Sequence, residues 1–246
     1  MTSKTEAGRP AFYALAPGGW RDYVTLLHVP YTAWHLSYVA IGAALTPAFA
    51  WSRFLPTLAA FFLAVGIGAH ALDELNGRPL ATRIPERMLL ALAALSIGGA
   101  VAIGVLGAVT VDPWLALFVV VGGFVVVAYN LELAGGRFHG DLWFALAWGA
   151  FPLATAYFAV AERLDAVVLA GAAFAFLLSR AQRQLSTPVR DVRRRVSSVE
   201  GRVERSDGHS EPVTTELLLR GKEAALRSLA ATSVALAVAL VTMRVT

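Results

Sequence analysis

Long apolar runs separated by short polar segments set the pattern of this chain. Because a helix rises about 1.5 Å per residue, about 20 apolar residues are enough to cross the roughly 30 Å hydrocarbon core of a membrane. Lipid also leaves helices as the simplest way to pair every backbone polar group. The pattern therefore predicts an all-α, polytopic membrane helix bundle, with residues 1–29 preceding a bundle formed by residues 30–246. We expect about seven transmembrane helices, at approximately 30–50, 54–72, 88–110, 113–130, 142–161, 165–181 and 224–243.

Composition supports this interpretation. The chain is 57% hydrophobic and only 15% charged, with a mean hydropathy of +0.61, whereas soluble domains carry about 25% charged residues. Glycine and alanine recur in the apolar runs, as in GGAVAIGVLGAV, which favours close helix–helix approach in lipid. The absence of cysteine excludes disulfides and thiolate metal sites.

The basic residues predict an orientation. If the N-terminus is cytoplasmic, the cytoplasmic segments are 1–29, 70–87, 131–141 and 182–223, and these segments with their immediate flanks hold all but three of the 21 lysines and arginines. The three on the other side are Arg53, Arg163 and Arg244. This asymmetry follows the positive-inside rule and predicts a multi-pass protein of the cell membrane. Topology also accounts for the isoelectric point near 9.8, so we expect membrane lipids and no nucleic acid as partners.

Residues 182–223 are expected to form a basic cytoplasmic loop, the only extended hydrophilic stretch. Valines recur within it at intervals of three and four residues, which is typical of an amphipathic helix lying on an anionic leaflet. They are Val189, Val192, Val196, Val199 and Val203. The alternative is a basic loop that only fixes the topology. The following SDGHSEP predicts a turn.

A concentrated group of polar residues follows the second predicted span, in GAHALDELNGRPLATRIPE (68–86). His70, Asp73 and Glu74 have i, i+3, i+4 spacing, which places them on one helix face, where an imidazole and two carboxylates can bind a divalent cation. Arg78 and Arg83 just beyond them are suited to phosphate oxygens. The alternative is that the acids end the helix and the arginines contact lipid head groups.

A second polar loop, YNLELAGGRFHGD (129–141), opens on the same predicted side. Tyr129, Asn130 and Arg137 belong to it, and the two loops are expected to converge over one cavity. The alternative is an ordinary loop rich in turn-forming residues. Other nearby polar side chains are expected to be hydrogen-bonding groups rather than metal ligands: His28, His35, His139 and Asp141.

Taken together, these motifs resemble the UbiA superfamily of intramembrane prenyltransferases over roughly residues 25–180. That family carries an Asp-rich NDxxDxxxD motif after its second span, followed by an Arg-Pro stretch; here AHALDELNGRP and GRPLATRIP occupy those places. Asp73 matches the second aspartate, His70 replaces the first, and Gly77 falls at the third. The resemblance continues through Tyr129 and Arg137 into DLWFALAWGAFPL.

The resemblance implies a fold and an activity. It implies a UbiA-like bundle that transfers an isoprenoid group from a prenyl diphosphate to a lipophilic or aromatic acceptor, with Mg²⁺ as cofactor. Asp73 and Glu74 would be catalytic and, with His70, would bind the Mg²⁺. The substrate-binding residues would be Arg78, Arg83, Arg137 and Arg183 for the diphosphate, and Asn76, Tyr129 and Asn130 for orientation.

The chain departs from the family pattern in two places. The second Asp-rich motif after span six is replaced by LLSRAQRQLSTPVRDVRRR, with Arg180, Arg183 and Arg190 where acids are expected, and no segment corresponds to the usual last two of nine spans. Two hypotheses therefore remain: a divergent, shortened prenyltransferase, or a catalytically inactive UbiA-like protein that binds an isoprenoid or another lipid or scaffolds a protein partner that the sequence does not identify. A transporter is disfavoured because no inverted repeat with paired broken helices is visible.

Overall fold

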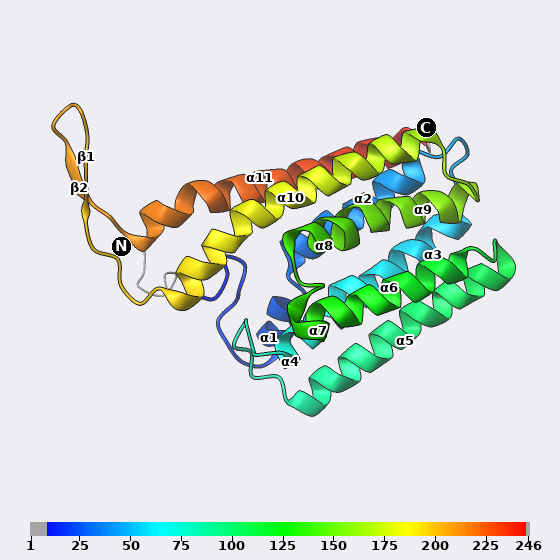
Figure 1. Ribbon diagram of the computed structural model, residues 1–246, viewed down its shortest axis with the longest axis horizontal. Helices are drawn as coiled ribbons and strands as arrows, with labels where there is room; N and C mark the ends of the chain where they lie inside the picture. Colours follow the sequence, from blue (N-terminus) through cyan, green and yellow to red (C-terminus); the bar gives the residue numbers. More distant parts are fainter. Residues whose placement is uncertain (1–8, 245–246) are drawn as a thin grey trace.

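The computed structural model describes residues 9–244, and helices make up most of it (Figure 1). Along the chain the helices are α1 Trp20–Leu26, α2 Val29–Ala44, α3 Trp51–Phe61, the π-helix η1 Phe62–Ala69, α4 His70–Leu75, α5 Glu86–Thr110, α6 Leu115–Asn130, α7 Leu133–Gly136, α8 Asp141–Ala145, the π-helix η2 Leu146–Ala150, α9 Phe151–Ala161, α10 Ala166–Arg195 and α11 Thr215–Thr242. Two short strands, β1 Arg202–Glu204 and β2 Ser210–Pro212, pair antiparallel.

Five continuous helical stretches are long and apolar enough to cross a membrane: Trp51–Leu75, Glu86–Thr110, Asp141–Ala161, Ala166–Arg195 and Thr215–Thr242. The α6 helix is apolar but shorter, and α2 has 16 residues. The prediction of an all-α membrane bundle is confirmed in this form, while the count of seven spans stays a prediction. On α5, Leu95, Leu106 and Val109 are largely exposed, as expected for side chains that face lipid.

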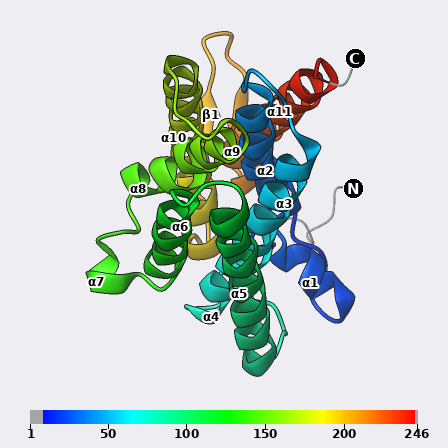
Figure 2. The ribbon, with the colours of Figure 1, turned by 90° about the vertical axis from the view of Figure 1, so that its right-hand side faces the viewer.

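The helices run roughly parallel, with α10 and α11 on one side of the bundle and α5 and α6 on the other (Figures 1 and 2). Between them, α2 packs against both α9 and α11, and η1 packs against α5. One buried cluster lies among α2, α9, α10 and α11, and it includes Trp34, Tyr38 and Tyr157. A second joins η1, α4, α5, α6 and η2.

Two glycines allow helix backbones to approach closely, as the small-residue pattern predicts. A Cβ on Gly42 in α2 would lie 2.2 Å from the carbonyl oxygen of Leu153 in α9. A Cβ on Gly149 in η2 would lie 2.6 Å from the carbonyl oxygen of Ala175 in α10. Because neither backbone oxygen can rotate away as a side chain does, these contacts set the helix spacing in the middle of the bundle.

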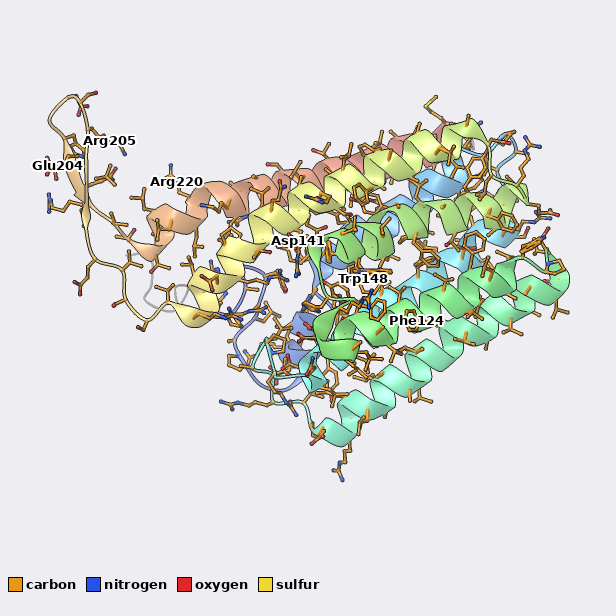
Figure 3. The ribbon with its side chains drawn as sticks, viewed as in Figure 1. Phe124, Asp141, Trp148, Glu204, Arg205 and Arg220 are labelled. Atoms are coloured by element: carbon orange, nitrogen blue, oxygen red, sulfur yellow. The ribbon has the colours of Figure 1, made fainter. Side chains whose placement is uncertain are left out.

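Residues 182–223 differ from the loop that the sequence predicts. The α10 helix continues to Arg195, β1 and β2 form a hairpin that projects beyond the bundle, and α11 already begins at Thr215 (Figures 1 and 3). A largely buried ion pair between Arg193 and Glu223, with nitrogen and oxygen 2.5 Å apart, joins the two helices here. The prediction of an amphipathic helix is therefore wrong beyond Arg195. The turn predicted at SDGHSEP is confirmed: it lies within the hairpin, where Gly208 has a φ of 84°.

The two ends of the bundle differ in charge. Residues 9–19, the loops 76–85 and 131–140, and the hairpin lie at one end, which we call the polar end. At the opposite end, Arg53 pairs with Glu162, Arg163 with Asp165, and Arg244 donates to the carbonyl of Ala44 at 2.7 Å. The predicted grouping of these three arginines away from the other basic residues is confirmed.

Candidate functional site

A cavity of about 680 Å³ opens at the polar end. Its walls come from residues 10–13, the beginning of α2, η1 and α4, the end of α6, and about the last four turns of α10. We call it the polar cavity. Six of the predicted site residues line it: His70, Asp73, Asn76, Tyr129, Asn130 and Arg183. The expected convergence of the two polar loops over one cavity is therefore confirmed.

Two π-helical segments shape the walls of this cavity. Such turns are rare and are frequent at functional sites. The carbonyl of Trp148 cannot accept the usual α-helical hydrogen bond, because the residue four positions later is Pro152, which has no N–H. His35 from α2 supplies the missing donor through Nδ1, at 2.8 Å. This bond fixes the position of the Trp148 backbone and also leaves the Nε2 of His35 as the unprotonated ring nitrogen.

Asp73 and Glu74 are neighbours with different surroundings. The Glu74 side chain is fully buried, and its carboxylate accepts hydrogen bonds from the backbone N–H of Leu80 at 2.9 Å and from the N–H and hydroxyl of Thr82, each at 2.8 Å. It thus holds the loop 76–85 and does not line the cavity. The carboxylate of Asp73 lines the cavity and makes no hydrogen bond or ion pair with any described residue.

Three of the predicted phosphate-binding arginines lie outside the cavity. Arg78 donates to the carbonyls of Thr82 and Ile84, at 3.2 and 2.7 Å, and so stabilises its own loop. The side chains of Arg83 and Arg137 are exposed to solvent. Neither of them lines the cavity.

The arginines that do face the cavity come from α10. Arg183, Arg190 and Arg194 are spaced by seven and four residues, which places them on one helix face. Arg183 forms an ion pair with Asp141 at 2.9 Å, where the start of α8 passes α10 (Figure 3). Arg190 and Arg194 have no carboxylate partner among the described residues, and their guanidinium groups reach only the hydroxyl of Thr187 and the carbonyl of Pro10. Two guanidinium charges are therefore available to an anion.

Four of the five histidines of the chain line the polar cavity: His28, His35, His70 and His139. The rings of His28 and His70 lie 3.9 Å apart, and His28 has the left-handed backbone angles φ 46° and ψ 47°, which are uncommon for a residue with a side chain. Burial, and secondarily the neighbouring His70, holds the pKa of His28 well below its usual range. The ring is neutral near pH 7, so it adds polarity to the cavity wall without adding charge.

Three buried side-chain atoms in the described part of the chain lack a hydrogen-bond partner: the Nε2 of His28, the hydroxyl of Tyr129 and the Oε1 of Gln182. All three belong to residues that line the polar cavity. Tyr129 is 4% exposed and Gln182 is 2% exposed. Buried polar atoms are nearly always paired in folded proteins, so this cavity is suited to a polar guest that completes their hydrogen bonds.

An apolar groove of about 280 Å³ adjoins the polar cavity. It runs between α3, η1, α5, α6 and η2 towards the opposite end, where it meets Arg53 and Thr110. Val65 and Trp148 line both the groove and the polar cavity, and the ring of Trp148 in η2 packs against Tyr129 in α6 (Figure 3). The two spaces are therefore neighbours that share these two side chains as part of their walls.

The side chains at the site fit only part of the predicted Mg²⁺ chemistry. Among the described residues no group of three or more His, Asp or Glu side chains is arranged to hold a metal ion. The predicted trio of His70, Asp73 and Glu74 is not assembled, because Glu74 holds the loop and His70 stacks on His28. Mg²⁺ is usually bound by one or two carboxylates together with substrate phosphates. A Mg²⁺ ion here would depend on a phosphate ligand that arrives with it. Asp73 is the cavity carboxylate that would hold the ion, since the other two, Glu132 and Asp191, lie within 4 Å of His139 and Arg195.

Comparison of the chain with family models, with curated proteins and with solved structures found no match in any of the three.

The geometry identifies cavity-lining residues that the sequence interpretation missed or set aside: His28, His35, Trp148, Gln182, Arg190 and Arg194. The sequence could have predicted Arg190 and Arg194, because their spacing from Arg183 places all three on one helix face if the helix continues past Arg183, as α10 does.

Proposed function

We propose that this protein is an intramembrane prenyltransferase, which takes an isoprenoid diphosphate as donor and passes the prenyl group to a lipophilic or aromatic acceptor. The observation that carries the proposal is that a polar, arginine-lined cavity and an apolar groove lie side by side, with Val65 and Trp148 lining both; we take this shared wall as the junction of the two spaces. A molecule with a diphosphate head and a hydrocarbon tail matches both spaces at once. The orientation predicted from charge would place the polar end, and hence the diphosphate, on the cytoplasmic side.

The side chains have distinct roles in this proposal. Arg190 and Arg194 hold the diphosphate oxygens, since charge-assisted hydrogen bonds from guanidinium groups suit phosphate. Asn76 and Asn130 orient the head group, and their own contact, from the Asn76 amide to the Asn130 carbonyl at 3.2 Å, ties α4 to α6. Asp73 would hold the Mg²⁺ that accompanies the diphosphate and that neutralises part of its charge.

The reaction takes place at the junction. The bond between the allylic carbon and the diphosphate oxygen breaks, the electron pair leaves with the diphosphate, and the arginines stabilise the charge that develops there. The acceptor forms the new bond to that carbon and gives its proton to the departing diphosphate. The rings of Trp148 and Tyr129, whose centroids are 5.3 Å apart, border the place where the allylic carbon would carry positive charge. An aromatic face stabilises a cation in such a dry site.

Binding to the purified protein tests this proposal. A non-hydrolysable prenyl diphosphate analogue is titrated against the protein in detergent, and Arg190→Gln is compared with Arg137→Gln, whose side chain is exposed at the same end of the bundle. A hydrogen bond to a charged group contributes about 1.5–3 kcal/mol, so we expect Arg190→Gln to raise the Kd by about 10-fold or more and Arg137→Gln to leave it unchanged. If the analogue does not bind, or if both variants bind as tightly as the parent, the proposal is wrong.

A second candidate is favoured by one observation: among the described residues, Asp73 is the one cavity-lining carboxylate without an ion-pair partner, whereas the UbiA superfamily uses two Asp-rich motifs. A non-catalytic carrier of an anionic isoprenoid needs the arginines and the groove but no ionisation of the substrate. Under this alternative the analogue binds as described above, and an authentic prenyl diphosphate is released intact after prolonged incubation with membrane extract. Appearance of inorganic diphosphate and a prenylated product excludes the carrier.

A further inference from the structure

We propose that residues 9–15 form a gate over the polar cavity, and we call this segment the N-terminal strap. Four of its residues, Pro10, Ala11, Phe12 and Tyr13, line the cavity. They make up one of the parts of the wall that have no regular helix, while the other walls come mainly from the bundle helices and the turns that follow them. In Figure 1 the strap passes beside the lower end of α10 on its way to α1.

The strap is held by two polar contacts from α10. Arg193 donates to the carbonyl of Arg9 at 3.3 Å, and Arg194 donates to the carbonyl of Pro10 at 3.5 Å. Both acceptors are neutral backbone oxygens at long distances, and such bonds contribute less than charge-assisted pairs with a carboxylate or phosphate. The strap is also attached elsewhere: the N–H of Leu15 donates to the hydroxyl of Thr25 at 3.0 Å, and Ala11 and Ala14 are buried in a cluster with Leu80. Opening has to break these contacts as well.

Aromatic contacts add to the attachment of the strap. The ring of Phe12 lies under the guanidinium carbon of Arg227, 5.1 Å away, and its centroid is 6.2 Å from that of Tyr31. Tyr13 meets Tyr31 at 5.5 Å and His28 at 5.2 Å. These side chains form a small cluster at the edge of the cavity, so the loss of the Phe12 ring alone removes a large part of the attachment.

A hinge adjoins the strap at Gly18 and Gly19. Their φ angles are 116° and 62°, values that suit glycine, and a Cβ on either would meet no atom within 4 Å. Directly after the hinge, Asp22 at the start of α1 accepts from the N–H groups of Gly18, at 2.9 Å, and of Arg83, at 2.9 Å. The bond from Gly18, and a second from the N–H of Leu15 to the hydroxyl of Thr25 in α1 at 3.0 Å, span the two glycines. Rotation at the glycines therefore moves the strap away from α1 only when both bonds break.

Arg194 links the gate to the contents of the cavity, because its guanidinium both lines the cavity and holds the strap. A head group enters from lipid only by moving its charge through the apolar groove, which is costly. Opening the strap instead gives anions a direct aqueous path into and out of the cavity, and closing it excludes water from the site. This gating role does not depend on which anion the cavity binds.

Because the chain has no cysteine, a single introduced thiol reports access without further engineering. Ser186→Cys places a thiol at a buried position in the cavity wall, and Ser206→Cys places one at the exposed turn of the hairpin. The rate of reaction with a polar, membrane-impermeant maleimide is measured for each in detergent. We expect Ser186→Cys to react at least about 10-fold more slowly than Ser206→Cys.

Removal of the strap contacts is the decisive step. In the Ser186→Cys background, Phe12→Ala should raise the reaction rate about 10-fold, and Arg227→Met should raise it a few-fold, since a partly exposed cation–π contact is weak. Phe138→Ala is the matched control, because Phe138 is an aromatic residue at the same end that packs on Phe124 and Trp143 and does not line the cavity.

Two outcomes overturn the gate. One is a Ser186→Cys thiol that reacts as fast as Ser206→Cys in the parent, which means that the cavity is already open. The other is a rate that neither Phe12→Ala nor Arg227→Met changes. Size-exclusion profiles of each variant identify misfolded protein, and because Arg227 lies outside the cavity lining, its variant gives an independent answer if Phe12→Ala fails to fold. A rate that rises equally in Phe138→Ala also counts against the gate, since it reports general loosening of the polar end.

Discussion

At the scale of single residues, loss of the charge should lower the stability of the fold at Glu74 but leave it unchanged at Asp73. Glu74→Gln replaces one carboxylate oxygen with an amide that cannot accept from the Leu80 or Thr82 donors, so we expect a loss of stability of about 1–3 kcal/mol. Asp73→Asn changes no hydrogen bond with a described residue, so its stability should stay near that of the parent. Thermal unfolding of both variants in one detergent checks this contrast, and equal melting temperatures for the two would contradict it.

The same pair of residues shows what the sequence can and cannot predict about the site. Spacing correctly places His70 and Asp73 beside one cavity, because helix geometry alone fixes which positions share a face. Spacing also groups Glu74 with them, yet its side chain bonds to a loop whose path depends on residues 77–85 and on Asp22, far away in the chain. Which of two adjacent carboxylates is free is therefore a tertiary property.

At the scale of helices, the close approach of α2 and α9 predicts a large effect from one methyl group. Gly42→Ala places a Cβ 2.2 Å from the backbone oxygen of Leu153, so the two helices must separate. Overpacking of this kind typically costs about 1–3 kcal/mol. Gly98→Ala in α5 is the matched control, since its Cβ meets nothing within 4 Å and should be neutral or slightly stabilising. A melting temperature that falls equally in both variants would show that the α2–α9 contact is looser than described.

Apolar periodicity predicts where most of the helices lie, but not how they end. The seven apolar runs coincide with helices because lipid-facing composition is a local property. No apolar run predicts the extension of α10 to Arg195. The extension depends on burial of Val189 in the cluster shared with α11 and on the ion pair between Arg193 and Glu223. The apolar pattern does not predict the π-helical segment η2 either, since the hydrogen-bond donor to its Trp148 carbonyl is His35, 113 residues away in the sequence.

At the scale of the whole molecule, charge and hydropathy together produce a site that is polar at one end of the bundle and apolar towards the other. The basic residues gather at the polar end, and the polar cavity there holds two arginines, Arg190 and Arg194, that have no carboxylate partner within residues 9–244. The apolar groove continues from this cavity towards the opposite end, along helices whose outer faces are suited to lipid. An amphiphile bound in both spaces lies along the bundle with its head at the polar end, and the length of its tail is limited by what fills the groove.

Tail length can therefore be changed from within the groove. Gly123 in α6 lines it, and a Cβ there meets no atom within 4 Å, so Gly123→Leu adds a side chain to the groove without displacing a neighbour. Since each buried methylene contributes about 0.8 kcal/mol, we expect the Kd of a 20-carbon prenyl diphosphate analogue to rise by at least about 10-fold, while that of a five-carbon analogue stays unchanged. Gly98→Leu, at an equally open position outside the groove, should affect neither. Equal weakening of the short and long analogues by Gly123→Leu would show that the tail does not follow this groove.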